Sequence, residues 1–452
     1  MKPLVTRKNN FYPYLLLFIQ PIFMASNIIV ARGGVEYVPP VSLAFWRWLT
    51  VFIILMPFFF EEIIKKKKKL RKESLKLFFL GLMGCGICGA FPFIEIQASS
   101  AYEIGVQHGI MLQERVQACV NWYFELFAKN GYNDMEDLRS VADKFKITIA
   151  EANPDWLDEM EGISVGSKIE LWKIICINCR TEIVSRKNAM PNPTECTSMV
   201  SPGTSFIAQN WDWDIRLQDL TVISKIVRTD KNNHTILQIQ EPGILGKIGL
   251  NSAGIGCTLN ILFSKNNTGS NQAGVPVHIF LRSVLDCATT IEDAVSAIQT
   301  LPKHYAAQSC ITISDAHGKY AICEFNGDTV DVAWQASPAC HTNHYCGLGG
   351  NGVVQKLPKK PSSTSERYNR ASELIAKSNG NLSLQDVKQI LGDQNGFSTS
   401  NFPIAVPFSK AGASTLNMEV GTVTTVICDL NNLKMHLTPG SPLKYNYVTY
   451  DL

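Results

Sequence analysis

Cys196 lies in a polar segment of the kind that can present a thiol to a substrate. Pro191 and Pro193 precede it and Pro202-Gly203 follows it, and residues of these types favour turns and loop ends. Further along comes the run Asn210-Trp211-Asp212-Trp213-Asp214, which combines carboxylates with indole rings. A thiol in this setting is a candidate nucleophile. Because the chain has 13 cysteines, a packed core cysteine is the alternative.

A nucleophilic thiol needs a nearby base, and the sequence offers two kinds. Of the eight histidines, His341 and His344 are the most suggestive, in the run Cys340-His341-Thr342-Asn343-His344-Tyr345-Cys346. Alternatively, cleavage of the bond between Glu195 and Cys196 would release the α-amino group of the cysteine, whose ordinary pKa of about 8 allows it to take the thiol proton. These residues leave both a Cys-His hydrolase and a self-cleaving enzyme open.

The spacing of apolar residues changes at Cys196 from a helical period to an alternating one. Apolar residues recur at helical spacing before it, and short alternating runs bounded by Asp, Asn, Gly and Pro follow it. The spacing predicts helices over 102–129, 135–145, 154–160, 165–178, 277–288, 291–301, 366–377 and 383–391. It predicts strands over 93–100, 205–210, 221–228, 235–240, 247–250, 254–260, 308–315, 319–326, 421–429 and 433–438. This order suits two packed sheets covered by helices on both outer faces.

Three long apolar runs come before these elements, at Asn9–Ala31, Tyr37–Phe60 and Leu77–Ile94. Each is long enough to cross a hydrocarbon layer about 30 Å thick, so we predict three transmembrane helices and a multi-pass membrane protein. Lysines and arginines before the first run and between the second and third place those flanks in the cytoplasm. The catalytic part is then extracytoplasmic if the third helix spans the bilayer.

Charge and cysteine spacing exclude other classes of partner. The net charge of +3 is the sum of a basic membrane end and a mildly acidic remainder, so no nucleic-acid partner is expected. Cys85 with Cys88, and Cys176 with Cys179, form two C-x-x-C pairs that together resemble a four-thiolate zinc site. The first pair lies inside an apolar, glycine-rich run, so we predict no metal and no cofactor.

Six motifs occur in an order that carries a family resemblance. They are Cys196-Thr197-Ser198, Gln209-Asn210-Trp211-Asp212-Trp213, GLNSAGIGCTLN at 249–260, GVPVHIFLRSVL at 274–285, His341-Thr342-Asn343-His344 and SERYNRASELI at 365–375. Together they resemble the acyl-CoA:6-aminopenicillanic acid acyltransferase (isopenicillin N acyltransferase) family of N-terminal-nucleophile hydrolases, from about residue 93 to about residue 442. Through residues 24–59, the first 90 or so residues resemble the start of a drug/metabolite (EamA-type) transporter.

The resemblance implies an α+β fold, the αββα four-layer sandwich of N-terminal-nucleophile proteins, preceded here by the three transmembrane helices. It divides the chain into a membrane region (1–93), a mainly helical segment of the proenzyme (94–195) and a catalytic αββα part (196–445). In this reading Cys196 matches the nucleophile and Asp212 the aspartate that orients the new amino group. Asn343 matches the asparagine that helps hold the tetrahedral oxyanion. Asn210, Trp211, His341 and His344 are supporting residues.

Two departures from the family pattern bear on this reading. The residue before the nucleophile is Glu195, where the penicillin enzyme has a glycine that eases the strained geometry of self-cleavage. The region near Glu419–Gly421 lacks the family's late catalytic arginine. Penicillin-specific chemistry is therefore not expected.

The sequence thus predicts a membrane-anchored cysteine amidohydrolase or acyltransferase for small N-acyl amides or acyl thioesters such as acyl-CoA. Its chemistry would pass through an acyl-Cys196 intermediate. Cleavage between Glu195 and Cys196 would make it a heterodimer of its own fragments. The alternative is a non-catalytic membrane or transporter-fragment protein whose other part only binds a ligand.

Overall fold

The computed structural model describes residues 91–186, 196–230, 234–262, 273–301, 307–326, 329–347, 363–378, 381–395, 403–407 and 419–452. All of them belong to the compact unit Gly89–Leu452. The first two apolar runs, most of the third run and Glu195 lie outside the described residues. Among the helices that are described, none combines the length and the apolar character needed to cross a membrane.

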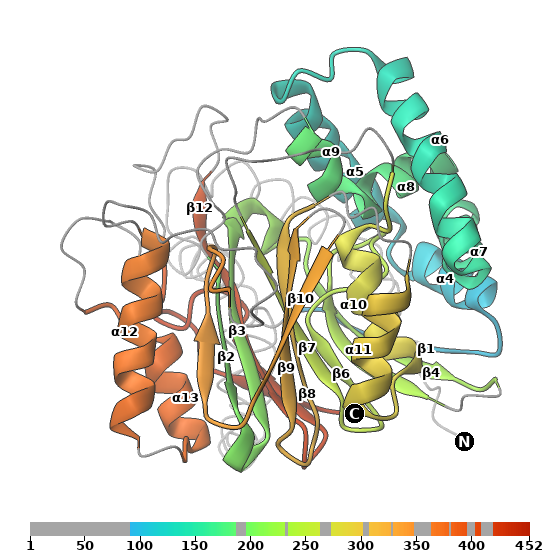
Figure 1. Cartoon of the computed structure of the whole chain (residues 1–452). Coiled ribbons are helices and arrows are strands. Elements are labelled where there is room, and N and C mark those ends of the chain that lie inside the picture. The colour runs from blue at the N-terminus through green and yellow to red at the C-terminus, as the bar shows by residue number, and fades with distance from the viewer. Residues whose placement is uncertain are drawn as a thin grey trace, which may run out of the picture. The chain divides into compact units, whose positions relative to one another are not determined.

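Two β-sheets form the centre of this unit (Figure 1). The eight-stranded sheet has, in spatial order, β1 (Phe93–Ala98), β4 (Val222–Arg228), β5 (Thr235–Gln240), β6 (Gly249–Asn251), β7 (Gly256–Ile261), β8 (Ser309–Ser314), β9 (Tyr320–Asn326) and β10 (Thr329–Gln335). The six-stranded sheet has β11 (Ala339–His341), β2 (Thr197–Ser201), β3 (Phe206–Asp214), β12 (Val420–Asp429), β13 (Lys434–Leu437) and β14 (Val448–Asp451).

Helices cover the outer face of each sheet, so the described part from Cys196 onward has the expected αββα order. On one side α10 (Val277–Cys287) and α11 (Ile291–Thr300) pack on β6 to β9, and on the other α12 (Ser363–Lys377) and α13 (Leu384–Leu391) pack on β11 and β3. The two sheets meet where β2 and β3 face β7 and β8. Central strands such as β3 and β7 are buried along almost their whole length because both of their faces are covered.

The strand β1 joins the part of the chain before Cys196 to the larger sheet. It pairs in parallel with β4, with Phe93 opposite Ile223. The run FIEIQA was predicted as a strand, and this is confirmed. Because Phe93 and Ile94 are already in β1, the apolar run that ends at Ile94 does not remain helical to its end.

Six helices are described between β1 and residue 186: α4 (Ala101–Met111), α5 (Gln113–Lys129), α6 (Met135–Ala152), α7 (Pro154–Ser167), α8 (Leu171–Asn178) and α9 (Arg180–Arg186). The single helix predicted over 102–129 is divided at Leu112, whose φ of −118° and ψ of 20° are not helical. Likewise, the helix predicted over 165–178 is interrupted at Lys168, which is left-handed with a φ of 60°. Both breaks preserve the apolar spacing, so periodicity alone did not reveal them.

The helices α4 and α7 approach each other unusually closely because glycines line the contact. Gly105 and Gly109 of α4 face Gly162 and Gly166 of α7. A Cβ added at Gly105 would collide with the carbonyl oxygen of Glu159 and lie 2.8 Å from the nitrogen of Ile163. The backbones therefore fill the space that side chains occupy in most helix pairs.

This contact gives a stability prediction for Gly105→Ala. The added methyl group must push two backbones apart, so we expect a loss of roughly 2–3 kcal/mol in the free energy of unfolding, although alanine is the better helix former. Urea unfolding followed by tryptophan fluorescence measures it. Ile110→Ala is the matched control on the same helix, because Ile110 is 64% exposed, and it should change the value by less than about 0.5 kcal/mol. Equal stability of the two variants would contradict the close packing.

Candidate active site

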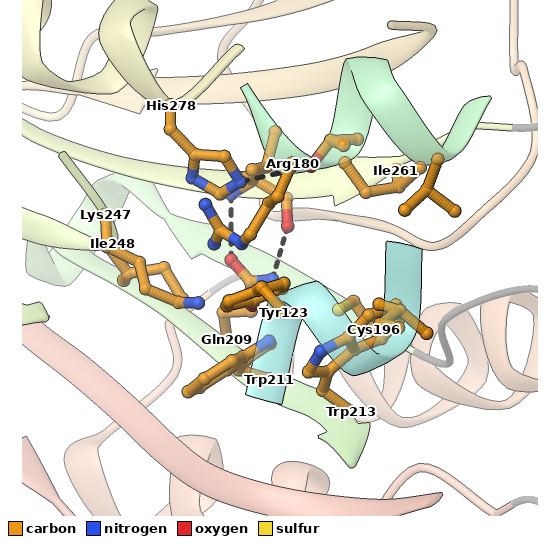
Figure 2. A pocket seen from close by; sticks show the side chains of 14 residues that line it. Tyr123, Arg180, Cys196, Gln209, Trp211, Trp213, Lys247, Ile248, Ile261 and His278 are labelled. Carbon is orange, nitrogen blue, oxygen red and sulfur yellow. Dashed lines mark hydrogen bonds between the residues drawn. The ribbon is translucent and has the colours of Figure 1, made fainter. Parts of the chain in front are cut away.

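Cys196 immediately precedes β2 and lines a cavity between the sheets and the helical part (Figure 2). The cavity has a volume of about 50 Å³. Gln209, Trp211 and Trp213 also line it, since alternate side chains of β3 point to one face. Tyr123 of α5 and Arg180 and Thr181 of α9 enter from the helical part. The segment before Cys196 therefore supplies one wall of the pocket that holds the thiol.

The backbone of Cys196 is held on both sides of its Cα atom. Its nitrogen donates to Oδ1 of Asn343 at 3.0 Å. Its carbonyl oxygen accepts from Nη1 of Arg367 at 2.6 Å and from Nδ2 of Asn260 at 3.3 Å. The nitrogen and the thiol are thus fixed at the edge of the cavity.

Arg367 of α12 ties the two sides of this arrangement together. Its guanidinium is fully buried and donates to Oγ1 of Thr197 at 2.8 Å as well as to Cys196. It also donates to Oδ1 of Asn343 at 2.9 Å. A fork of fixed donors suits this task because several acceptors must be held in one geometry.

Asp212 lies beside Cys196 along the neighbouring strand. Its carbonyl oxygen is 3.9 Å from the Cys196 Sγ atom. Its carboxylate leaves β3 on the face opposite Trp211 and Trp213, where Oδ1 accepts from Oγ1 of Thr422 at 2.6 Å. The described partner of the Cys196 nitrogen is therefore Asn343.

The segment that carries Asn343 is fixed by buried hydrogen bonds. The Asn343 nitrogen donates to Oγ1 of Thr364 at 2.8 Å, and Nδ2 donates to the carbonyl oxygen of Ile261 at 2.9 Å. The His344 Nδ1 atom lies 2.9 Å from the same Thr364 hydroxyl. The Nε2 atom of His341 is 2.8 Å from Oε1 of Glu324. Both histidines thus bond to groups other than Cys196, and they shape the segment around Asn343.

Buried charges line the cavity away from Cys196. Glu241, at the end of β5, accepts from Arg180, Lys247 and the hydroxyl of Tyr123. The Lys247 ammonium also lies over the ring of Trp211, 3.2 Å from its centroid, a cation–π contact. Burial lowers the pKa of Lys247 to about 7, although Glu241 opposes the shift. Two cations around one carboxylate leave this end of the cavity with an excess of positive charge when Lys247 is protonated.

Neutral histidines lie around the loop that carries Lys247. The Nε2 atom of His108, on α4, accepts from the nitrogen of Gly243 at 2.9 Å, where Gly243 has a φ of +92° that favours glycine. The Nε2 atom of His278 lies 3.3 Å from Oγ1 of Thr181. Burial lowers the pKa of His108 to about 3. Burial, together with Arg180 and Lys247, also holds the pKa of His278 well below its usual value.

The Cys196 thiol is protonated at neutral pH. Burial raises its pKa to about 12, and the nearby Asp212 carboxylate adds to this shift. A thiol is a far weaker nucleophile than a thiolate. A base must therefore be supplied before Cys196 can react at neutral pH.

The structure places Cys196 and Trp211 at one cavity, with Asn343 bonded to the Cys196 nitrogen and Asp212 on the adjoining strand. Asn210 points elsewhere: its Nδ2 atom donates to the carbonyl oxygens of Leu391 and Ile404 at 2.8 and 2.7 Å, so it anchors the layer of α13. Of the paired cysteines, the Cys176 thiol donates to the carbonyl oxygen of Leu138 and packs in the core. Cys85 and Cys88 lie outside the described residues.

Sequence reasoning missed several residues of the site. Arg367 is part of the run SERYNRASELI and Asn260 ends GLNSAGIGCTLN, so both lie inside motifs already noted. Their roles depend on contacts between distant segments, which a single sequence does not display. For Arg180, Glu241 and Lys247, the sequence offers only one indication of a role in the site. Each is a charged residue in a segment that otherwise contains many apolar residues.

Comparisons with known proteins agree with this arrangement. The chain matches the family described as acyl-coenzyme A:6-aminopenicillanic acid acyl-transferase over residues 200–444. The 40 kDa form of acyl-coenzyme A:6-aminopenicillanic-acid-acyltransferase from Emericella nidulans is 27% identical over 278 residues, which cover 61% of this chain and 74% of that protein. The chain also matches the EamA-like transporter family over residues 11–111. Residues 93–98 and 101–111 of that match fold as β1 and α4.

Two solved structures are similar at low identity. A variant of the conjugated bile acid hydrolase from Clostridium perfringens aligns with a TM-score of 0.37 and 14% identity, covering 57% of this chain and 97% of that one. The penicillin V acylase from Agrobacterium tumefaciens aligns with a TM-score of 0.35 and 15% identity, covering 57% of this chain and 86% of that one.

The buried guanidinium predicts a large effect for Arg367→Met. The substitution keeps an apolar stem but leaves buried acceptors at Cys196 and Asn343 without this donor, so the free energy of unfolding should fall by roughly 2–4 kcal/mol. Urea unfolding measures the change. The control is Arg370→Met on the same helix, because Arg370 is partly exposed and pairs with Asp393 and Glu373; its cost should stay below about 1 kcal/mol. Unchanged stability in Arg367→Met would refute the assigned role.

The buried neutral histidines predict how stability depends on pH. In the unfolded chain His108 and His278 take up protons as the pH falls through 6.5, whereas in the folded chain they stay neutral. The unfolded state then binds more protons, so each histidine should lower the free energy of unfolding by about 1.2 kcal/mol as the pH falls from 6 to 5. Urea titrations across this range measure the slope. In His108→Gln, the difference in bound protons between the unfolded and folded states should fall by about one, and the slope should decrease accordingly. An unchanged slope would contradict the assignment of His108 as a buried neutral histidine.

Proposed function

Because the chain belongs to the acyl-coenzyme A:6-aminopenicillanic acid acyl-transferase family, we propose that it is a membrane-anchored cysteine amidohydrolase or acyltransferase of small N-acyl amides or acyl thioesters. The observation that carries the proposal is the setting of Cys196. Its thiol lines a cavity, and its nitrogen is held by Asn343. A residue that uses both its own amine and its own thiol needs this pair of constraints.

The first step is cleavage between Glu195 and Cys196. Hydrolysis of that peptide bond leaves a carboxylate on Glu195 and an α-amino group on Cys196. The new amine has an ordinary pKa of about 8 and can take the thiol proton, which supplies the base that the uncut chain lacks. The two products, residues 1–195 and 196–452, stay together as a heterodimer because β1 and β4 belong to one sheet.

Asn343 and Asp212 then divide the task of orienting the amine. Asn343 offers Oδ1 to the nitrogen, as it does in the uncut chain. The Asp212 carboxylate, close enough to raise the pKa of the Cys196 thiol, favours the charged form of the amine after proton transfer. The oxyanion role predicted for Asn343 requires its Nδ2 atom, which donates to Ile261 in the uncut chain, and it stays a prediction.

Catalysis follows as acyl transfer through the sulfur. The Cys196 thiolate attacks the carbonyl carbon of an amide or thioester, and the amine of Cys196 returns the proton to the leaving group. Water or an acceptor amine then attacks the acyl-Cys196 thioester, which releases the acid or the new amide and restores the thiol. The aromatic side chains of Tyr123, Trp211 and Trp213 give the cavity an apolar lining that suits an acyl chain.

The membrane part of the proposal is supported by the match to EamA-like transporters over residues 11–111 and by the three apolar runs of the sequence. Three helices are too few to build the pathway of such a transporter, which requires two repeats. We therefore propose that they anchor the enzyme. The substrate reaches Cys196 from the side of the membrane on which the described unit lies.

The test is to express Cys196→Ala and wild type side by side. Denaturing electrophoresis should show fragments 1–195 and 196–452 in wild type and one intact chain in the variant, and Edman sequencing of the second fragment should begin Cys-Thr-Ser. Release of amine from N-acyl amides and of thiol from acyl-CoA should fall at least about a thousand-fold in the variant.

The control is Cys340→Ala, because Cys340 is buried on the neighbouring strand β11 and bonds to Ser372. It should cleave and turn over like wild type. Turnover that survives in Cys196→Ala would refute the proposed nucleophile. An intact but active wild type that loses activity on substitution of His341 or His344 would favour the Cys-His mechanism. An intact, inactive wild type that binds N-acyl amides would leave only a ligand-binding role.

A further inference from the structure

A second cluster of reactive side chains lies beside the segment that carries Asn343. Glu324 of β9, His341 at the end of β11 and Cys346 in the following loop bring a carboxylate oxygen, an imidazole nitrogen and a sulfur within 4.8 Å of one another. Among the described residues, these three form the group of potential metal ligands whose ligand atoms lie this close together. It is separate from the cavity of Cys196, which none of the three residues lines.

The imidazole of His341 is oriented as a ligand would be. Its Nδ1 atom lies 2.8 Å from the carbonyl oxygen of Thr342, and a carbonyl can only accept, so Nδ1 carries a proton. A hydrogen bond from Nδ1 to a backbone carbonyl is the usual partner of a histidine that ligates through Nε2. The Nε2 atom thus points at the rest of the cluster.

The contact between Nε2 and Glu324 requires a positive species between the two atoms. Nε2 lies 2.8 Å from Oε1 of Glu324, and two lone pairs would repel each other at this distance. A second proton satisfies both at this distance, and a metal ion would satisfy both once the two atoms move apart to roughly 3.3 Å. A proton serves only these two atoms, whereas a metal ion also draws in the neighbouring thiol of Cys346.

Backbone groups hold the Glu324 carboxylate in place independently of His341. The nitrogen of Cys346 donates to Oε1 at 2.7 Å, and the nitrogen of Gly347 donates to Oε2 at 3.0 Å. Such outer hydrogen bonds orient ligating carboxylates in metal sites. The loop that contributes the sulfur therefore also fixes the carboxylate.

A fourth donor is available from the adjoining strand. The Cys310 side chain of β8 lies close enough to His341 and Cys346 for both to shift the pKa of its thiol, although its sulfur is not among the three atoms that lie within 4.8 Å of one another. Two sulfurs, one nitrogen and one oxygen make the set that zinc binds as a tetrahedron, with neighbouring ligand atoms roughly 3.3–3.8 Å apart. The observed spread of up to 4.8 Å among the first three atoms needs only small side-chain movements to reach that size. Harder ions such as Mg²⁺ and Ca²⁺ prefer oxygen ligands and do not suit thiols.

We propose that Glu324, His341, Cys346 and Cys310 bind one Zn²⁺ ion with a structural role. Binding forms four bonds to the metal and releases three protons to solvent: one from the Nε2 atom of protonated His341 and one from each thiol. No metal was predicted from the sequence because Cys85 and Cys88 lie in an apolar run, and Cys310, Glu324 and the segment 341–346 show no ligand spacing that would have suggested this site. The ion ties β8 and β9 to the segment 341–347, and this segment carries Asn343, which contacts Cys196.

The wild-type protein provides the first test, which needs no variant. Full-length protein purified under reducing conditions and dialysed against Zn²⁺ should retain about one equivalent, as measured by elemental mass spectrometry. Replacement by Co²⁺ should give visible d–d bands of a tetrahedral site and a sulfur-to-cobalt charge-transfer band in the near ultraviolet. Protein without stoichiometric zinc, or a Co²⁺ spectrum that lacks the charge-transfer band, would overturn the proposal.

The second test compares Cys346→Ser with Cys340→Ser. Loss of one thiolate should weaken zinc binding at least tenfold and remove part of the charge-transfer intensity, whereas Cys340→Ser should bind as wild type does because that thiol bonds to Ser372 and Tyr368. Circular dichroism confirms that each variant is folded. Equal zinc affinity in the two variants would refute the ligand set. Both tests read metal content and spectra, so their outcome does not depend on whether Cys196 is the nucleophile.

Discussion

The buried guanidinium of Arg367 is the contact on which the rest of the site depends. It comes from α12, on the outer face of the smaller sheet, and reaches through to the carbonyl oxygen of Cys196 and to Oδ1 of Asn343. A fully buried cation is tolerated only where several acceptors surround it. The acceptors include the carbonyl oxygen of Cys196 and Oδ1 of Asn343, which holds the Cys196 nitrogen. The hydrogen bonds that stabilise the buried charge are therefore the same ones that position Cys196.

The same burial accounts for the low reactivity of the thiol. Removal from water raises the pKa of Cys196 to about 12, so the proposed nucleophile is protected before the proposed cleavage. An amine created on the same residue needs no further approach of a base, because it is already covalently in place. The proposed enzyme therefore gains activity from a change in bonding and not from a rearrangement of the fold.

The part of the chain before Cys196 is integral to the catalytic unit. Its first strand belongs to the larger sheet, and Tyr123 and Arg180 line the cavity. A further tie runs from α7 to α10, where Glu159 and the buried Arg282 form two hydrogen bonds of 2.8 and 2.7 Å. Residue 195 is therefore a boundary only for the proposed cleavage reaction. In the tertiary structure the segments before and after it share a sheet, a pocket and an ion pair.

The sequence by itself indicated two sheets covered by helices, most of the individual helices and strands, and the choice of Cys196 and Trp211, which the structure places at one cavity. These features follow from local periodicity, turn residues and motifs that lie close together in the chain. It missed the strands β2, β10, β11 and β14 and the helix α9. The segments TSMVS of β2 and ACH of β11 are short and do not alternate between buried and exposed residues. Only the tertiary structure decided that Asn343 holds the Cys196 nitrogen, that Asn210 supports α13, and that Arg367, Lys247 and Glu324 meet their partners. Such contacts join residues far apart in sequence, and their energies depend on burial, which no single segment encodes.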